Sequence, residues 1–199
     1  MANSSKTVIG ISIFVIIVLS SVGLFILTFL DQEQSNISQA NWKTYKNDAY
    51  GFGIKYPNAV TVNEVPADLD PFYDWNEVDF YNKDKDLELS VSSWANENSY
   101  KTLDDLVKGE AKMQREGFTS VIPTIPAKNQ KFILDGMPAI KWYYTDEKYD
   151  NIGVSVVTLR DKYFYHIEGK PYSEKYISKF TAEEGNLFNQ MLSTFKFTK

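Results

Sequence analysis

His166 is the only histidine in the chain, and it lies in the stretch YFYHIEG. In an extended strand its side chain shares a face with Phe164 and Glu168, because alternate residues point to the same side. A histidine next to a carboxylate can act as a general base or help to hold a metal ion. The alternative is a histidine that packs against its neighbours or lies at the rim of a sheet.

Catalysis of the serine–histidine type needs more than a histidine. The base must lie within about 3 Å of its nucleophile, and a carboxylate must orient the base from behind. The chain has no G-x-S-x-G element and neither of the standard glycine-rich phosphate-binding loops. We therefore assign no catalytic residue and predict that the protein is not an enzyme. A hydrolase with an unrecognised site around His166 is the least favoured alternative.

A second candidate site is acidic. Carboxylates that converge in a loop can bind calcium, which takes about 6 to 8 oxygen ligands. The EF-hand pattern fails here, because no glycine follows the third ligand position and the terminal glutamate is misplaced. The alternative is a solvated loop, so no metal centre is predicted and calcium stays an alternative cofactor. The candidate ligand-binding residues are Asp68, Asp70, Asp74, Glu77, Asp79 and His166.

Composition and charge exclude several classes of function. The chain has no cysteine, which excludes disulfide bonds, thiol nucleophiles, a lipidated cysteine and zinc sites built from thiolates. The net charge of the 199 residues is -5 at pH 7, and without residues 1–30 there are 20 basic side chains against 26 acidic ones. A negative domain without a basic run does not attract a phosphate backbone, so we expect no nucleic-acid partner.

The strongest pattern is an uncharged, mostly apolar run at residues 8–30. A helix needs roughly 20 such residues to cross a bilayer, whereas the apolar part of a cleaved signal peptide has about 7 to 15. We therefore predict one N-terminal transmembrane helix that anchors the protein in the cell membrane. Lys6 precedes the run, and Asp31 and Glu33 follow it, so the positive-inside rule places the N-terminus in the cytoplasm.

This orientation divides the chain into four predicted parts. They are a cytoplasmic tail (residues 1–7), the transmembrane helix (8–30), a polar tether (31–41) and an extracytoplasmic domain (42–199). At about 3.3 to 3.6 Å per extended residue, the tether holds the domain within roughly 40 Å of the bilayer.

Short runs of alternating residues predict strands throughout the domain. Residues 42–46 and 50–56 form a first hairpin, and residues 78–81 and 87–94 form a second. In the second hairpin, apolar residues occupy one face of residues 87–94, while Glu88, Ser90 and Ser92 occupy the other. Further strands are predicted at residues 131–134, 139–145, 154–159 and 163–168, with Asp135-Gly136 as one tight turn, which indicates an antiparallel meander.

Two predicted helices, together with these strands, set the expected fold class. Thr102 with Asp105 begins one predicted helix, and Thr181 with Glu184 forms a capping box at the start of another. Helices on either side of a run of strands indicate an α+β fold, an antiparallel β-sheet covered by helices.

In residues 50–56, large side chains alternate with Gly51 and Gly53, which predicts a buried stripe on one face and a close approach on the other.

Three stretches resemble the PsbP-like family, which includes many anchored prokaryotic proteins. They are WKTYKNDAYGFGIKYP near the start of the domain, LDGMPAIKWYY in its middle and FNQMLSTFKF at its end. The resemblance spans residues 42–197 and implies an α-β-α sandwich around an antiparallel sheet. The stretch NAVTVNEV after the YP element lacks the tryptophan expected there. No metal or cofactor ligand of the family matches a position of this chain, and the fold by itself implies no function.

Together these patterns predict a membrane-anchored extracytoplasmic binding or assembly domain, with an unidentified protein partner. A module that binds a small ligand or a cation, through the acidic stretch or an aromatic cleft, is the alternative.

Overall fold

The computed structural model describes residues 39–65, 75–96, 100–116, 125–126, 128–144, 152–172 and 179–198. The chain divides into two compact units, Met1–Asn41 and Trp42–Lys199. Of the first unit, the described part is the 3-10 helix Gln39–Asn41. The predicted transmembrane segment at residues 8–30 lies outside the described residues. In the part of the chain that is described, no helix combines the length and apolarity needed to cross a membrane.

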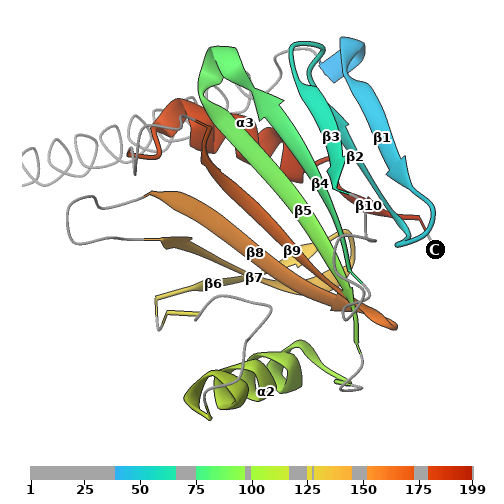
Figure 1. Ribbon diagram of the computed structural model, residues 1–199, viewed down its shortest axis with the longest axis vertical. Coiled ribbons are helices and arrows are strands. Elements are labelled where there is room, and N and C mark those ends of the chain that lie inside the picture. Colours follow the sequence, from blue (N-terminus) through green and yellow to red (C-terminus); the bar gives the residue numbers. More distant parts are fainter. Residues whose placement is uncertain are drawn as a thin grey trace, which may run out of the picture. The chain divides into compact units, whose positions relative to one another are not determined.

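The second unit is built from antiparallel strands in two sheets (Figure 1). The large sheet has the order β3-β4-β5-β9-β8-β7-β6, and the small sheet has the order β1-β2-β10. The strands of the large sheet are β3 (Thr61–Val65), β4 (Trp75–Asn82), β5 (Leu87–Ala95), β6 (Gln130–Leu134), β7 (Met137–Tyr144), β8 (Gly153–Arg160) and β9 (Tyr163–Pro171). Those of the small sheet are β1 (Lys43–Asn47), β2 (Phe52–Tyr56) and β10 (Lys196–Phe197).

The predicted pairs of strands are confirmed. The β1–β2 and β4–β5 hairpins form as expected, and β6 to β9 make the predicted antiparallel meander. Two strands escaped the sequence pattern, β3 and β10. The short β10 pairs with β2 in the register Phe197↔Phe52, a contact that no local pattern reveals.

Both predicted helices form where their capping residues indicated. In α2 (Leu103–Arg115), the Thr102 hydroxyl accepts a hydrogen bond from the Asp105 N–H at 3.1 Å. In α3 (Ala182–Leu192), the Thr181 hydroxyl accepts from the Glu184 N–H at 3.2 Å, and the Glu184 carboxylate accepts from the Thr181 N–H. A short helix between β4 and β5 spans Lys83–Lys85. The fold is therefore α+β and dominated by sheet.

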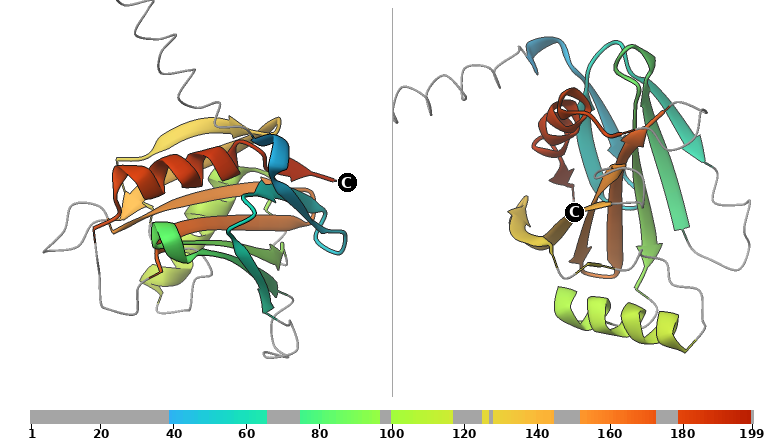
Figure 2. Two further views of the ribbon diagram at one scale, coloured as in Figure 1. Left: turned by 90° about the horizontal axis from the view of Figure 1, so that it is seen from above. Right: turned by 90° about the vertical axis from the view of Figure 1, so that its left-hand side faces the viewer.

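The two faces of the large sheet are covered differently (Figure 2). The small sheet and α3 pack on one face, which we call the apolar face. The helix α2 packs on the opposite face, over the β7–β8 end of the sheet, where Leu103 and Leu106 meet Ile140, Trp142 and Val157. Side chains on this second face change from apolar to polar towards β4 and β5.

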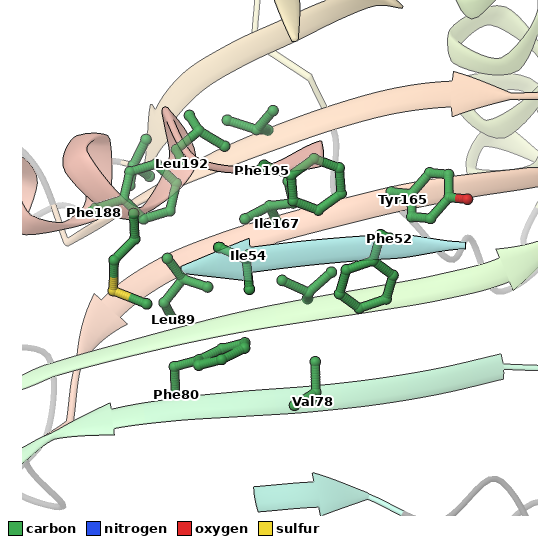
Figure 3. Packing of buried hydrophobic residues seen from close by; sticks show 14 of the residues in the cluster. Phe52, Ile54, Val78, Phe80, Leu89, Tyr165, Ile167, Phe188, Leu192 and Phe195 are labelled. Carbon is green, nitrogen blue, oxygen red and sulfur yellow. The ribbon is translucent and has the colours of Figure 1, made fainter. Parts of the chain in front are cut away.

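The apolar face holds the main core (Figure 3). Phe52 from β2 is fully buried, stacks on Phe195 with ring centroids 5.6 Å apart, and meets the edge of Tyr165. The buried Tyr165 hydroxyl donates to the Tyr50 carbonyl at 2.6 Å and so ties β9 to the turn between β1 and β2 of the small sheet. The predicted buried stripe of residues 50–56 is therefore real.

A close approach between α3 and the large sheet requires a glycine in β9. A Cβ atom at Gly169 would lie 2.4 Å from the Phe188 ring, which is shorter than any ordinary contact. Phe188 is itself fully buried. The missing side chain at Gly169 therefore lets the aromatic ring of α3 rest directly on the strand.

Candidate functional site

Three of the predicted site residues meet on the face of the large sheet opposite to the apolar face. The strand register places Glu77 on β4 beside Ser92 on β5, and Ser92 beside His166 on β9. Residues directly opposite one another in a ladder point to the same face. The structure thus brings together a carboxylate and a histidine that are far apart in the sequence.

Two further rows of polar side chains run parallel to this one. Asp79 lies beside Ser90, which lies beside Glu168 on β9 and then Ser155 on β8. The third row contains Tyr81, Glu88 and Lys170. We call these side chains the polar face: Glu77, Asp79, Tyr81, Glu88, Ser90, Ser92, Ser155, His166, Glu168 and Lys170.

Hydroxyl groups supply most of the hydrogen bonds to the carboxylates of β4. The Ser90 hydroxyl donates to Asp79 Oδ1 at 2.7 Å, and the Tyr81 hydroxyl donates to Asp79 Oδ2 at 2.9 Å. The Ser92 hydroxyl donates to Glu77 Oε2 at 3.1 Å. Because Asp79 is buried, these bonds compensate for the water that its carboxylate has lost.

The polar face carries an excess of negative charge. Its carboxyl groups are Glu77, Asp79, Glu88 and Glu168, and Lys170 lies among them with its Nζ 3.0 Å from Glu88 Oε1. Burial, followed by the charge of Asp79, raises the pKa of Glu77. Burial lowers the pKa of Lys170, but the hydrogen bond to Glu88 and the surrounding carboxylates outweigh it, so the pKa is raised overall.

His166 is buried beside two aromatic side chains. Its Nε2 lies 2.5 Å from the Ser155 hydroxyl, and its ring lies near the indoles of Trp94 and Trp142. Burial, together with the positive charge of Lys170, lowers the pKa of His166 to about 4. The imidazole is therefore neutral at pH 7, and its Nε2 shares one hydrogen bond with the Ser155 hydroxyl.

The Ser155–His166 pair has the spacing of a nucleophile and its base, but it is enclosed. Ser155 is fully buried, and His166 is 7% exposed. A substrate carbonyl must approach the serine oxygen directly, and an enclosed hydroxyl does not allow that approach. A histidine with a pKa near 4 is also a weak base at neutral pH. This geometry suits a structural hydrogen bond.

The described residues include only part of the predicted acidic site. Asp68, Asp70 and Asp74 lie outside the described residues, so the structure does not test whether they converge with Glu77 and Asp79. Among the residues that are described, no group of three or more histidine or acidic side chains is arranged to hold a metal ion. The calcium hypothesis stays a prediction about the undescribed part of the stretch.

An accessible apolar pocket lies elsewhere, between α2 and the β6–β7 hairpin. Its volume is about 450 Å³, within the range of roughly 300 to 1,000 Å³ that is typical of ligand pockets. Leu103 of α2, Phe132 and Ile133 of β6, and Pro138 and Ala139 of β7 form most of its wall.

The rim of this pocket is polar, and one of its apolar residues is open to solvent. Lys131 Nζ lies 3.3 Å from Asp104 Oδ1, and both side chains are exposed. Ile133 is 65% exposed, although its neighbour Leu134 is buried in the core.

The sequence contained partial signals for the residues that were missed. Alternation in residues 87–94 placed Ser90 and Ser92 on a polar face, but it could not show which carboxylates they would meet. Ser155 lies in a run of valines, where one hydroxyl carries no specific signal. The pocket had no signal, because its walls come from three elements that only the tertiary fold brings together.

Comparison with known proteins finds matches among solved structures. No family model matches the chain, and no curated protein matches it in sequence. Among solved structures, the chain is similar to the cyanobacterial PsbP (CyanoP) of Synechocystis, with 16% identity and a TM-score of 0.48, over 81% of this chain and 95% of that one. That protein carries the name of the family that the sequence motifs resemble.

A protein from Bacteroides thetaiotaomicron is also similar, with 16% identity and a TM-score of 0.44. The match covers 80% of this chain and 49% of that protein, so the chain spans about half of its length. Likenesses at this level concern the fold alone.

Proposed function

We propose that the protein is a membrane-anchored, extracytoplasmic domain that binds a protein partner and catalyses no reaction. Residues 8–30 serve as the anchor, and the unit formed by residues 42–199 is held near the bilayer by the tether. The partner is another extracytoplasmic protein, and the domain contributes to its assembly or retention at the membrane.

The observation that carries this proposal is the contrast between enclosed polar groups and accessible apolar ones. The Ser155–His166 pair is buried, and the hydroxyl groups of Ser90 and Ser92 are committed to carboxylates. The accessible pocket is instead lined by aliphatic and aromatic groups beside the exposed Ile133. A surface of this kind supports binding of an apolar group.

The location can be tested by labelling, because the chain has no cysteine of its own. Lys83 is exposed in the short helix between β4 and β5. In intact cells that make the full chain with Lys83→Cys, a membrane-impermeant maleimide should label the new thiol. The matched variant Ser5→Cys, in the predicted cytoplasmic tail, should react only after lysis. Labelling of Lys83→Cys that also requires lysis would overturn the proposed orientation.

Binding can be tested by photo-crosslinking in native membranes. A photoreactive amino acid is placed in the full chain at exposed positions, one at a time: Gln130, Lys83 and Lys112. We expect one protein to be captured in stoichiometric amount from at least one position. Capture from none of them contradicts the proposal. So does an activity of the chain that Ser155→Ala abolishes while the fold is retained.

A further inference from the structure

We propose that the free edge of β6 binds an extended segment of the partner protein as an added strand. One apolar side chain of that segment enters the pocket beside Ile133, and an acidic side chain two positions away lies opposite Lys131. This inference rests on the proposed function and specifies how the partner is recognised.

The backbone of β6 offers unpaired groups at the edge of the large sheet. The β6–β7 turn has positive φ at both Asp135 (45°) and Gly136 (85°), which identifies a two-residue hairpin turn of the I′ type. In such a hairpin the flanking residues, Leu134 and Met137, form a hydrogen-bonded pair, and the bonding alternates along the ladder. The N–H and C=O groups of Ile133 therefore point away from β7.

The residue opposite Ile133 agrees with this assignment. Pro138 lies directly opposite Ile133 in the register, and a proline has no N–H to donate at that position. By the same alternation, Lys131 also points its N–H and C=O outward. Within the described part of the chain, these four backbone groups have no hydrogen-bond partner. They form a short row to which another extended segment can bond.

The side chains of β6 indicate what such a segment carries. Ile133 and Lys131 share one face of the strand, and that face borders the pocket. A residue placed beside Ile133 faces the pocket whose wall includes Leu103, so an aliphatic or aromatic side chain fits there. A residue two positions away lies opposite Lys131, whose ammonium group is exposed and has donors beyond the one directed at Asp104. Opposite charges are the favourable pair at that position.

A second copy of this chain fits the edge poorly. In an antiparallel pairing of two β6 strands, Lys131 can lie opposite the other copy's Lys131, Ile133 or Asp135. The first register opposes two like charges, and the second leaves the lysine opposite an aliphatic side chain. The third needs Asp135, which lies in the turn and already binds Lys196 Nζ at 2.7 Å and the Phe197 N–H at 2.8 Å. Charge complementarity therefore favours a different protein.

The central test is a variant that blocks the edge without breaking the hairpin. Because the N–H of Ile133 points outward, Ile133→Pro removes one docking group and leaves the bonds to β7 in place. The full chain, in lipid nanodiscs, is used to select binders from a displayed library of random linear peptides. We expect the enriched peptides to share an apolar residue and, two positions away, Asp or Glu. They should bind Ile133→Pro at least about tenfold more weakly than the unchanged chain.

Two further variants separate the backbone from the side chains. Ile133→Thr keeps the outward N–H but removes most of the apolar contact, so it should weaken the same peptides by less than Ile133→Pro does. Lys131→Glu should shift the selected residue from acidic to basic while the apolar position is retained. Circular dichroism and the melting temperature of each variant show that the fold is intact. An absence of enriched peptides, or equal binding to Ile133→Pro, overturns the proposal.

Crosslinking distinguishes this failure from failure of the proposed function. If a partner is captured from Gln130 in β6 and lost in Ile133→Pro, both proposals are supported. If a partner is captured from Lys83 or Lys112 and Ile133→Pro has no effect, the domain binds a protein but not through β6. Capture of a second copy of this chain through β6 also overturns the inference, because the occupant is then wrong.

Discussion

The two faces of the large sheet are made by the same strands, yet they have different physical roles. The apolar face is closed by α3 and the small sheet, and its contacts are aromatic and aliphatic. The polar face holds four carboxyl groups, one lysine and a neutral histidine, and hydrogen bonds compensate for their burial. We infer that the apolar face contributes most of the stability, while the polar side chains of the opposite face add a balance of opposing terms beside the smaller apolar cluster under α2.

The largest expected effect is on the apolar face. Phe188→Ala should lower the free energy of unfolding by about 3 to 5 kcal/mol, because it removes a fully buried ring and leaves a cavity over Gly169. Chemical denaturation of the full chain in detergent measures the change. The matched control Asn186→Ala, on the exposed side of α3, should change it by less than about 0.5 kcal/mol. Similar values for the two variants would contradict the assignment of the core.

On the polar face, the largest expected effect is a loss of stability as the pH falls. The pKa of His166 falls from 6.5 in the unfolded chain to about 4 in the folded one. Between these values the unfolded state binds more protons, so stability is lost as the pH falls from 6.5 to 4. The expected loss is about 3 kcal/mol. His166→Gln should lack this component, and the difference between the two pH profiles isolates it from the titration of the carboxylates. Parallel profiles would show that His166 is not buried as a neutral group.

Asp79→Ala should cost about 2 kcal/mol, less than Phe188→Ala. The change leaves the hydroxyls of Ser90 and Tyr81 without their acceptor, and Asp79 itself is buried. Asp79→Asn retains one acceptor oxygen and should cost less than Asp79→Ala. Thermal unfolding at pH 7 distinguishes the two variants. If Asp79→Ala is neutral, the hydroxyls have found other acceptors.

Glu77→Gln should raise the free energy of unfolding at pH 7 instead of lowering it. Because the pKa of Glu77 is raised in the folded state, its ionisation costs stability as the pH rises through that pKa. The neutral amide removes this cost and can still accept from Ser92. The gain at pH 7 should stay below about 1 kcal/mol, since Glu77 is only half-buried and solvent screens its charge. Lower stability of Glu77→Gln at pH 7 would mean that the carboxylate has a stabilising partner.

The smallest expected effect is that of added calcium on the melting temperature. The carboxylates of Asp79 and Glu77 already accept hydrogen bonds from hydroxyl groups. We expect no change in the melting temperature of the full chain when calcium is added to millimolar concentrations. A specific ligand must stabilise the fold that it binds. A rise in melting temperature that the combined change of Asp68, Asp70 and Asp74 to Asn abolishes would instead establish a calcium site in that stretch.

Local patterns were enough to predict most of the elements. Alternation marked strands such as β5, where Leu89 and Ser90 face opposite sides, and the capping residues Thr102 and Thr181 marked the start of each helix. These signals work because side-chain direction and capping depend on residues within one strand or one turn. The edge strand β3 and the two-residue β10 lacked such a signal, since their pairing depends on distant strands.

The candidate site was predicted only in part. Glu77, Asp79 and His166 were recognised by residue type, but their common face depends on β5 lying between β4 and β9. The same strand order encloses Ser155 beside His166 and so changes a group with catalytic chemistry into a buried hydrogen bond. A sequence does not state which strands are neighbours.

The sequence by itself thus determined the α+β class, most of the strands, the helix starts and several residues able to do chemistry, because each depends on local periodicity and side-chain type. The tertiary structure alone decided which of those residues meet, which are closed to solvent and where a pocket opens. Burial and pairing arise from contacts between distant segments: among the described strands none lies beside the outer edge of β6, where Ile133 is 65% exposed.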